Sequence, residues 1–200
     1  MTYKAPLKDM LFNIEHLARI DEIAKIPGFE DAGLETAPAV LEEAAKFNEG
    51  VLSPLNWEGD KNPSSWKDGV VTATPGFKEA FKQFAEGGWQ GLQHPADFGG
   101  QGLPKTIGAA CGEMLNSANM SFALCPLLTD GAIEALLTAG TPEQQAALDE
   151  PERHVGGAHG AQQQGIEATP LVDGLGRGSV DEVNRGLQTR VLRPPDRVRH

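Results

Sequence analysis

The sequence predicts an all-α protein, and three observations carry this prediction. Apolar residues recur at intervals of three and four along most of residues 1–149, as they do on the buried face of a helix. Only Val70-Val71-Thr72 is typical of an extended segment, and it is too short to build a sheet. Residues 87–104 contain six glycines and two prolines, which excludes a helix or a long strand and predicts an ordered loop.

The first predicted helix spans residues 7–26, where apolar residues at helical spacing alternate with charged ones. Asp21 can cap a second short turn, and Pro27-Gly28 ends it, because proline and glycine both interrupt helices. His16 falls opposite the apolar stripe, which favours a solvated histidine over a ligand-binding one.

A long second helix is predicted to begin at Thr36. We expect Pro54 to bend or end this helix, since proline lacks the backbone donor that a helix interior needs. Residues 56–66 are rich in Asn, Asp, Gly, Pro and Ser, which predicts a loop. Trp57 and Trp66 are expected to pin that loop to the bundle.

A third helix is predicted after Thr74-Pro75, which supplies a cap and a first-turn proline, and Gly87 ends it. Three phenylalanines share one helical stripe there: Phe77, Phe81 and Phe84. Such a stripe indicates a packed core rather than a cofactor site.

The helices after the loop are predicted in the same way. Apolar residues from Ile107 onward indicate a helix that ends near Asn119. A further helix, closed by Gly140, carries three more apolar residues at helical spacing: Ile133, Leu136 and Leu137. Thr141-Pro142-Glu143-Gln144 is a capping box, so another helix begins there. Five or six helices with modest connections predict a bundle.

The composition changes after residue 149 and predicts two parts. All twelve aromatic residues and all nine lysines lie at or before Phe122, whereas seven of the eight arginines lie at Arg153 or later. The helical period also fails beyond Asp149. We therefore expect a helical domain at residues 1–149 and a poorly ordered Gly/Arg-rich tail at residues 150–200.

The net charge of −11 argues against nucleic acid and anionic membranes as partners, because both need clustered Lys and Arg. No uninterrupted apolar run approaches the roughly 20 residues of a membrane span, and the first residues lack the layout of a secretion signal. We therefore expect a cytoplasmic protein. Cys111 and Cys125 are expected to be reduced packing residues rather than a disulfide.

No residue qualifies as a catalytic, cofactor-binding or metal-binding candidate from its motif. Gly99-Gly100-Gln101-Gly102 lacks the strand and sequence of a phosphate-binding or dinucleotide-binding loop, which favours a structural turn. His94 and Asp97 lie three residues apart, but no nucleophile accompanies them. The three histidines after residue 150 lack metal-ligand spacing: His154, His159 and His200.

The glycine-rich segment also carries a family resemblance. Its pattern, Gly-Trp-x-Gly-Leu followed by Asp-Phe-Gly-Gly-x-Gly-Leu-Pro, resembles the N-terminal helical domain of the acyl-CoA dehydrogenase family, where such a loop joins two helices. The resemblance covers about residues 1–147 in one continuous order. It is closest to the branch that acts on 3-(methylthio)propanoyl-CoA, through the opening Tyr3-Lys4-Ala5-Pro6-Leu7-Lys8-Asp9-Met10-Leu11-Phe12 and short matches such as Leu52-Ser53-Pro54-Leu55-Asn56 and Ala139-Gly140-Thr141.

The resemblance implies a function. In this family FAD and the acyl-CoA are held mainly by a middle β-barrel-like domain and a C-terminal four-helix bundle. A glutamate in the later part removes the α-proton while the flavin accepts the β-hydride. The N-terminal domain closes the acyl pocket, and the segment matching Leu127, Leu128 and Gly131 is the expected pocket wall.

The chain departs from the family after the helix at Thr141. Where the family has Thr-Glu-Pro-x-Ala-Gly-Ser-Asp, residues 154–159 are His-Val-Gly-Gly-Ala-His, and a change of reading frame is our hypothesis for the difference. The expected protein is an incomplete acyl-CoA dehydrogenase that is inactive alone and does not retain FAD. The alternative is a non-catalytic helical interaction module, associating through an exposed apolar face of the bundle, with itself or with a partner.

Overall fold

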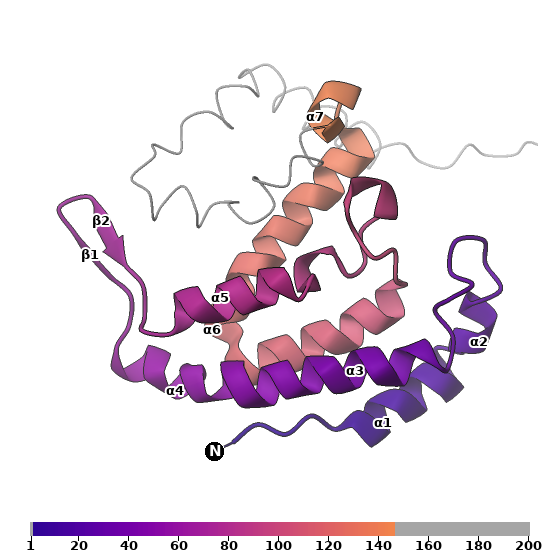
Figure 1. Ribbon diagram of the computed structural model, residues 1–200, viewed down its shortest axis with the longest axis horizontal. Coiled ribbons are helices and arrows are strands. Elements are labelled where there is room, and N and C mark those ends of the chain that lie inside the picture. Colours follow the sequence, from indigo (N-terminus) through magenta and orange to yellow (C-terminus); the bar gives the residue numbers. More distant parts are fainter. Residues whose placement is uncertain (1, 147–200) are drawn as a thin grey trace, which may run out of the picture. The chain divides into compact units, whose positions relative to one another are not determined.

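The computed structural model of the chain describes residues 2–146 (Figure 1). These residues form helices and a single two-stranded hairpin, which confirms the all-α fold class. The predictions for residues 150–200, including the tail and the boundary at 149, lie outside the described residues.

The N-terminal region is helical but interrupted. Helix α1 (Leu7–Phe12) runs into a π-helical turn (Asn13–Leu17), and α2 (Ile20–Ile23) follows. Arg19, between them, has a left-handed backbone with a φ of 55°, so the helix is interrupted there, and the predicted second short turn begins at Ile20 with Arg19, not Asp21, at its N-cap. The π-turn also changes the helical register, and Leu17 is consequently 73% exposed instead of lying on the buried stripe. His16 is exposed, as predicted.

The second helical region is longer than predicted. Helix α3 (Thr36–Phe47) continues through a second π-helical turn (Asn48–Leu52) into α4 (Ser53–Lys61). Pro54 does not end this run: it stands in the first turn of α4, directly after the π-helical turn, at a position where proline is tolerated. The predicted loop therefore begins only after α4, and Trp57 belongs to the helix.

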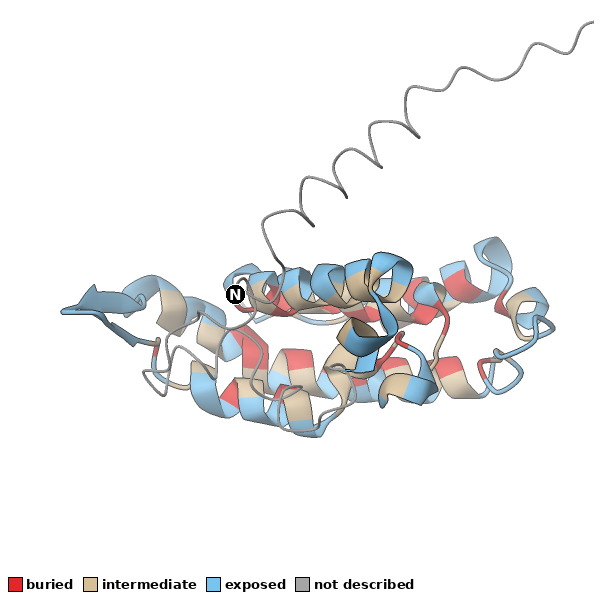
Figure 2. Cartoon of the chain, turned by 90° about the horizontal axis from the view of Figure 1, so that it is seen from above, coloured by how far each residue is buried: buried red, intermediate tan, exposed pale blue. Residues whose placement is uncertain are grey.

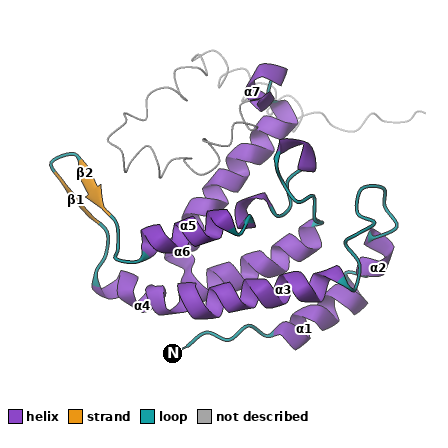
Figure 3. Cartoon of the chain, viewed as in Figure 1, coloured by secondary structure: helices purple, strands orange, loops and turns teal. Residues whose placement is uncertain are grey.

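The extended segment is one strand of a hairpin. Strands β1 (Ser65–Lys67) and β2 (Val70–Thr72) pair antiparallel around Asp68-Gly69 (Figure 3). Both turn residues have positive φ, which is the geometry that favours Asp-Gly in two-residue hairpins. This register places Trp66 opposite Val71 on strands that are exposed at every position.

The prediction that two tryptophans pin this region to the bundle is wrong. Trp66 is 72% exposed and Trp57 is 63% exposed. Trp66 lies on the hairpin, which no helix covers, and the ring of Trp57 instead carries the ammonium of Lys61, 4.8 Å from its centroid.

Helix α5 (Phe77–Glu86) follows Gly76, whose φ is 87°. Its three phenylalanines contact Phe122, with ring centroids 6.0, 6.3 and 5.8 Å away for Phe77, Phe81 and Phe84. Edge-on and tilted rings at these distances are typical of aromatic core packing. The stripe is therefore core, as predicted.

Helix α6 (Lys105–Ala139) is kinked at Asn119, where φ is −160° and ψ is 89°. We call residues 105–118 the first arm and residues 120–139 the second arm; Figure 1 shows them diverging from the kink. Oδ1 of Asn119 accepts a hydrogen bond from N of Phe122 at 3.0 Å, so Asn119 is the N-cap of the second arm. The first helix ends where it was predicted to end, but the next begins at once.

The last described helix, α7 (Pro142–Ala146), starts with the predicted capping box. N of Thr141 donates to Oε1 of Gln144 at 2.9 Å, and N of Gln144 donates to Oγ1 of Thr141 at 3.3 Å.

Two apolar clusters hold the described residues together, and Figure 2 shows their buried positions on the inward sides of the helices. The first cluster joins α1, α2, α3 and the first arm of α6, and the second joins the start of α4, α5 and the kink region. Tyr3 and Trp89 pack against both clusters. The N-terminal segment and the glycine-rich loop therefore tie the two clusters to each other.

Among the described helices, α6 has the length and composition that a membrane span also needs. A core helix of a soluble bundle passes the same test. Asp130 and Glu134 interrupt the apolar stretch and face polar groups of the loop.

Candidate functional site

The glycine-rich loop, residues 87–104, is a packed corner between α5 and α6. Leu92 is buried, and the other apolar anchors are half-buried: Trp89, Phe98 and Leu103. The loop closes on itself, since N of Gln101 donates to O of Gly91 at 2.9 Å and N of Gly102 donates to O of His94 at 2.9 Å. These amides are therefore not available to cradle a phosphate, which supports the structural-turn interpretation.

One glycine of the loop is required by close packing. A Cβ on Gly100 would lie 2.1 Å from the carbonyl oxygen of His94 and 2.9 Å from that of Pro95. Both obstacles are backbone atoms, so no side-chain movement relieves the clash.

A cavity of about 140 Å³ lies between the loop, α3, α5 and both arms of α6. Its lining is mainly apolar and includes Phe47, Trp89, Cys111, Leu115, Pro126 and Leu127. A concave, mainly apolar site with a few polar groups at its edge is the usual form of a small-molecule pocket.

The three residues predicted as a pocket wall all lie on the second arm. Leu127 lines the cavity, whereas Leu128 and Gly131 do not. Leu128 is 74% exposed and Gly131 is also exposed. Together with two neighbours, the leucines form an exposed apolar face, defined by Met120, Leu124, Leu127 and Leu128.

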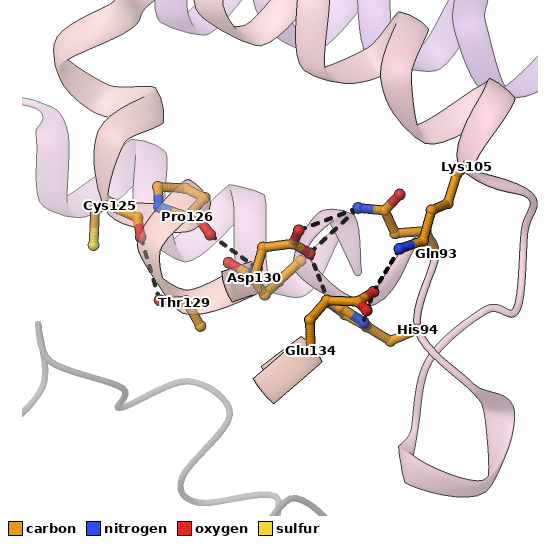
Figure 4. Close-up of polar contacts among 9 residues, drawn as sticks. Gln93, His94, Lys105, Cys125, Pro126, Thr129, Asp130 and Glu134 are labelled. Atoms are coloured by element: carbon orange, nitrogen blue, oxygen red, sulfur yellow. Dashed lines mark hydrogen bonds and ion pairs between the residues drawn. The ribbon is translucent and has the colours of Figure 1, made fainter. Parts of the chain in front are cut away.

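A set of polar side chains joins the loop and the first residue of the first arm to the second arm beside the cavity (Figure 4). We call it the clasp, and its members are Gln93, His94, Lys105, Asp130 and Glu134. Nε2 of Gln93 donates to both carboxylate oxygens of Asp130 at 3.3 Å. Nε2 of His94 lies 2.7 Å from Oδ1 of Asp130, and its Nδ1 lies 4.0 Å from Oε1 of Glu134. Nζ of Lys105 lies 3.1 Å from the same Glu134 oxygen.

Sequence reasoning missed the clasp. It weighed His94 with Asp97, three residues away, but the structure places His94 against Asp130 of the second arm. The signal was present in Asp130 and Glu134, which lie four residues apart and therefore on one face of an otherwise apolar helix.

The cysteine in the cavity wall is chemically inert. Burial raises the pKa of the Cys111 thiol to about 12, so the thiol is protonated near neutral pH and is not a nucleophile. Burial also raises the pKa of Cys125, on the second arm. Both cysteines are reduced. Within residues 2–146, no cluster of three His, Cys, Asp or Glu side chains could hold a metal ion.

The described residues do not by themselves fit FAD. The cavity of about 140 Å³ is smaller than the pockets of roughly 300–1,000 Å³ that take drug-sized ligands, and FAD is larger than those ligands. The loop amides that could have met its pyrophosphate are bonded within the loop. A flavin site would need further residues from elsewhere.

Fold and cavity together define a helical-bundle domain with a small apolar pocket, and comparison with known proteins identifies its family. Residues 35–148 match the family model described as acyl-CoA dehydrogenase, N-terminal domain. This match covers more than half of the chain. The chain belongs to the acyl-CoA dehydrogenase family, through its N-terminal domain, as the glycine-rich segment predicted.

Two relatives agree with this assignment. The chain is 45% identical over 146 residues to a 3-methylmercaptopropionyl-CoA dehydrogenase of Ruegeria pomeroyi, covering 73% of this chain and 25% of the relative. It is 28% identical over 119 residues to a broad-specificity linear acyl-CoA dehydrogenase of Mycobacterium tuberculosis, covering 58% of this chain and 20% of that relative. The chain thus spans about a quarter or less of the length of these relatives.

Proposed function

We propose that the cavity receives the acyl group of an acyl-CoA thioester, and that residues 2–146 form one side of the acyl pocket of a flavin-dependent acyl-CoA dehydrogenase. The observation that carries this proposal is the apolar cavity lined by Leu127, on the segment where the family resemblance implies a pocket wall. Its volume of about 140 Å³ suits a short acyl group, since a cavity of about 150 Å³ holds benzene. A 3-methylmercaptopropionyl group, with four non-hydrogen atoms beyond its carbonyl, is within that limit.

In this proposal the chain contributes shape rather than chemistry. FAD supplies hydride acceptance when it is bound by a family member. Phe47, Leu115 and Leu127 contact the acyl group on the side that these residues supply and shield that side from water. Asp130 borders the cavity, but Gln93 and His94 already engage its carboxylate, so it is not assigned the proton abstraction.

The proposed pocket is tested by a substitution whose larger side chain fills the cavity. Leu127→Trp should abolish the binding of S-butanoyl-N-acetylcysteamine to the 200-residue chain, measured by chemical-shift titration. Leu128→Trp is the matched control, because Leu128 is adjacent on the same helix but does not line the cavity. Equal loss of binding in both variants, or no binding by the unmodified chain, would contradict the proposed pocket.

The proposal also includes inactivity of the isolated chain. We expect no acyl-CoA turnover with an artificial electron acceptor and no flavin absorbance after purification. Measurable turnover would show that the chain itself supplies a base and a flavin site.

The exposed apolar face favours a second candidate, a non-catalytic interaction module. Its four side chains are each more than half exposed: Met120, Leu124, Leu127 and Leu128. Contiguous apolar surface of this kind usually marks a contact with another protein surface. Light scattering and apolar-dye fluorescence test it, and a monomer without dye binding would remove this candidate.

A further inference from the structure

We propose that the clasp sets the angle between the two arms of α6 and thereby limits the length of acyl group that the cavity admits. The inference rests on the proposed function and deepens it. It assigns His94 as a positioning residue for the acyl pocket, although His94 does not line the cavity.

The glycine-rich loop acts as a spacer between the arms. On the first arm, Gln93 packs so closely against Gly108 that a Cβ there would lie 2.6 Å from Oε1 of Gln93. On the second arm, Nε2 of Gln90 donates to O of Pro126 at 3.2 Å, and the clasp holds Asp130. Both arms also line the cavity. The distance that the loop keeps between the arms is therefore also the width of the cavity.

The second arm has little else to hold it. Phe122, Ala123 and Pro126 are buried, but beyond Pro126 no described residue of the arm is buried. Among the described residues, fully buried packing is therefore confined to its first two turns, and Ile133, Leu136 and Leu137 further along are half-buried. The remaining turns are held within the described residues by polar contacts, chiefly those of Asp130 and Glu134.

The kink supplies a place for the arm to turn. Asn119 has an extended backbone between two helical arms, so the continuous helical geometry that would stiffen α6 is broken at this residue. Nδ2 of Asn119 donates to O of Leu52 at 3.2 Å, which anchors the kink to the neighbouring helix. A change of angle at this position moves the far end of the second arm while its start stays in place.

Within the clasp, the buried contact dominates. The side chain of His94 is only 4% exposed and its Nε2 lies 2.7 Å from Oδ1 of Asp130, although neither ring nitrogen makes a hydrogen bond of good geometry. The Lys105–Glu134 pair is exposed, and exposed pairs contribute little. We therefore assign the main restraint to His94 and Asp130, and a smaller one to Glu134.

The test uses His94→Leu, which removes the polar contacts without altering a cavity-lining residue. His16→Leu is the matched control, because His16 is exposed and lies outside the clasp. Binding of S-acyl-N-acetylcysteamine thioesters, from propanoyl to decanoyl, is measured on the 200-residue chain. Each methylene that enters an apolar cavity raises affinity by about fourfold.

For the unmodified chain and His16→Leu, we expect the fourfold gain in affinity per methylene to stop once the acyl chain fills the cavity. For His94→Leu, the gain should continue for at least one further methylene. Glu134→Gln should shift the limit in the same direction by less, and it keeps the test valid should His94→Leu not fold. Hydrogen exchange of residues 127–139 should also accelerate in His94→Leu, with residues 105–118 unchanged.

Three results would overturn the inference. An unchanged length limit in a folded His94→Leu would do so while leaving the proposed pocket standing. A uniform loss of affinity at every chain length would show that His94 is merely structural. Absence of thioester binding by the unmodified chain would remove the proposed function, and this inference with it.

Discussion

The two arms of α6 belong to one helix but are held in different ways. The first arm buries a continuous stripe in the first apolar cluster: Ile107, Cys111 and Met114. The second arm buries residues only as far as Pro126, and it exposes Leu124, Leu127 and Leu128. Burial thus fixes the first arm, whereas the clasp and an N-cap fix much of the second.

This difference determines how firmly each arm is held. Exposing any methylene of the buried apolar stripe to water costs free energy, so the first arm has one well-defined position. Polar contacts at the edge of a cavity have smaller net energies, because water replaces them when they open. We therefore expect the second arm to be the more easily displaced wall of the cavity.

Gly100→Ala should have the largest effect, because it breaks the spacer between the arms. Its Cβ would meet the carbonyl oxygen of His94 at 2.1 Å, and the loop must open to relieve the clash. We expect a loss of about 4 kcal/mol in the free energy of unfolding. Urea denaturation measures it, with Gly99→Ala as a comparison in which nothing lies within 4 Å of the new Cβ.

At position 99 the φ of 74° would strain the backbone of the substituted alanine even though its Cβ meets no atom. We therefore expect Gly99→Ala to cost about 1 kcal/mol, well below the loss at Gly100. Equal losses at the two positions would mean that backbone conformation, and not the contact with His94, determines the requirement for glycine.

Met114→Ala tests the first arm. The Met114 side chain is fully buried, and shortening it should leave a cavity that costs about 3 kcal/mol in the free energy of unfolding. Met114→Leu, which nearly conserves volume, should cost less than about 1.5 kcal/mol. A loss below 1 kcal/mol for Met114→Ala, measured by urea denaturation, would contradict the view that burial fixes this arm.

The two arms also differ in how far the sequence predicted them. The helical period of apolar residues placed Ile107 and Met114 on a buried face, and the structure confirms it, because burial of a stripe is a local property of the helix. The pairing within the clasp was not predictable, since His94 and Asp130 meet only after the loop folds back between the arms, although the spacing of Asp130 and Glu134 marked one polar face of the helix. The second π-helical turn likewise left no periodic signal, and it let the helix pass Pro54.

The predicted pocket wall was inferred from the family resemblance and not from the helical period. The family resemblance pointed to Leu127, Leu128 and Gly131, and only Leu127 lines the cavity within the described residues. Adjacent positions on a helix point in directions about 100° apart, so a short segment cannot lie against one pocket with all its side chains. A resemblance at the level of a segment therefore does not say which of its side chains line a cavity.

Ionisation of the Cys111 thiol, on the first arm, should make the free energy of unfolding depend on pH. Burial raises its pKa from 9.0 to about 12 in the folded chain, so above pH 9 the unfolded chain binds fewer protons at this site than the folded one. The free energy of unfolding should accordingly fall by about 1.4 kcal/mol per pH unit between about pH 9 and 12 because of this group. Denaturation of Cys111→Ala over that range should show a shallower slope, and parallel slopes would rule out this contribution.

Asn119→Ala tests the junction of the arms. It removes the acceptor that caps the second arm and the donor to O of Leu52, and we expect a loss of about 1 kcal/mol. Asn119→Ser, which keeps a capping oxygen, should recover part of that loss. Calorimetry measures both variants, and an effect of Asn119→Ala on hydrogen exchange in the first arm alone would contradict its role as the cap of the second.

Leu128→Ala should have the smallest effect and completes the contrast with Met114→Ala. The Leu128 side chain is 74% exposed and does not line the cavity, so shortening it removes little buried apolar area. We expect the free energy of unfolding to change by less than about 0.5 kcal/mol. Urea denaturation at two protein concentrations is the measurement. A loss above 1 kcal/mol that grows with protein concentration would show that another copy of the chain covers the second arm, which would then be held by burial after all.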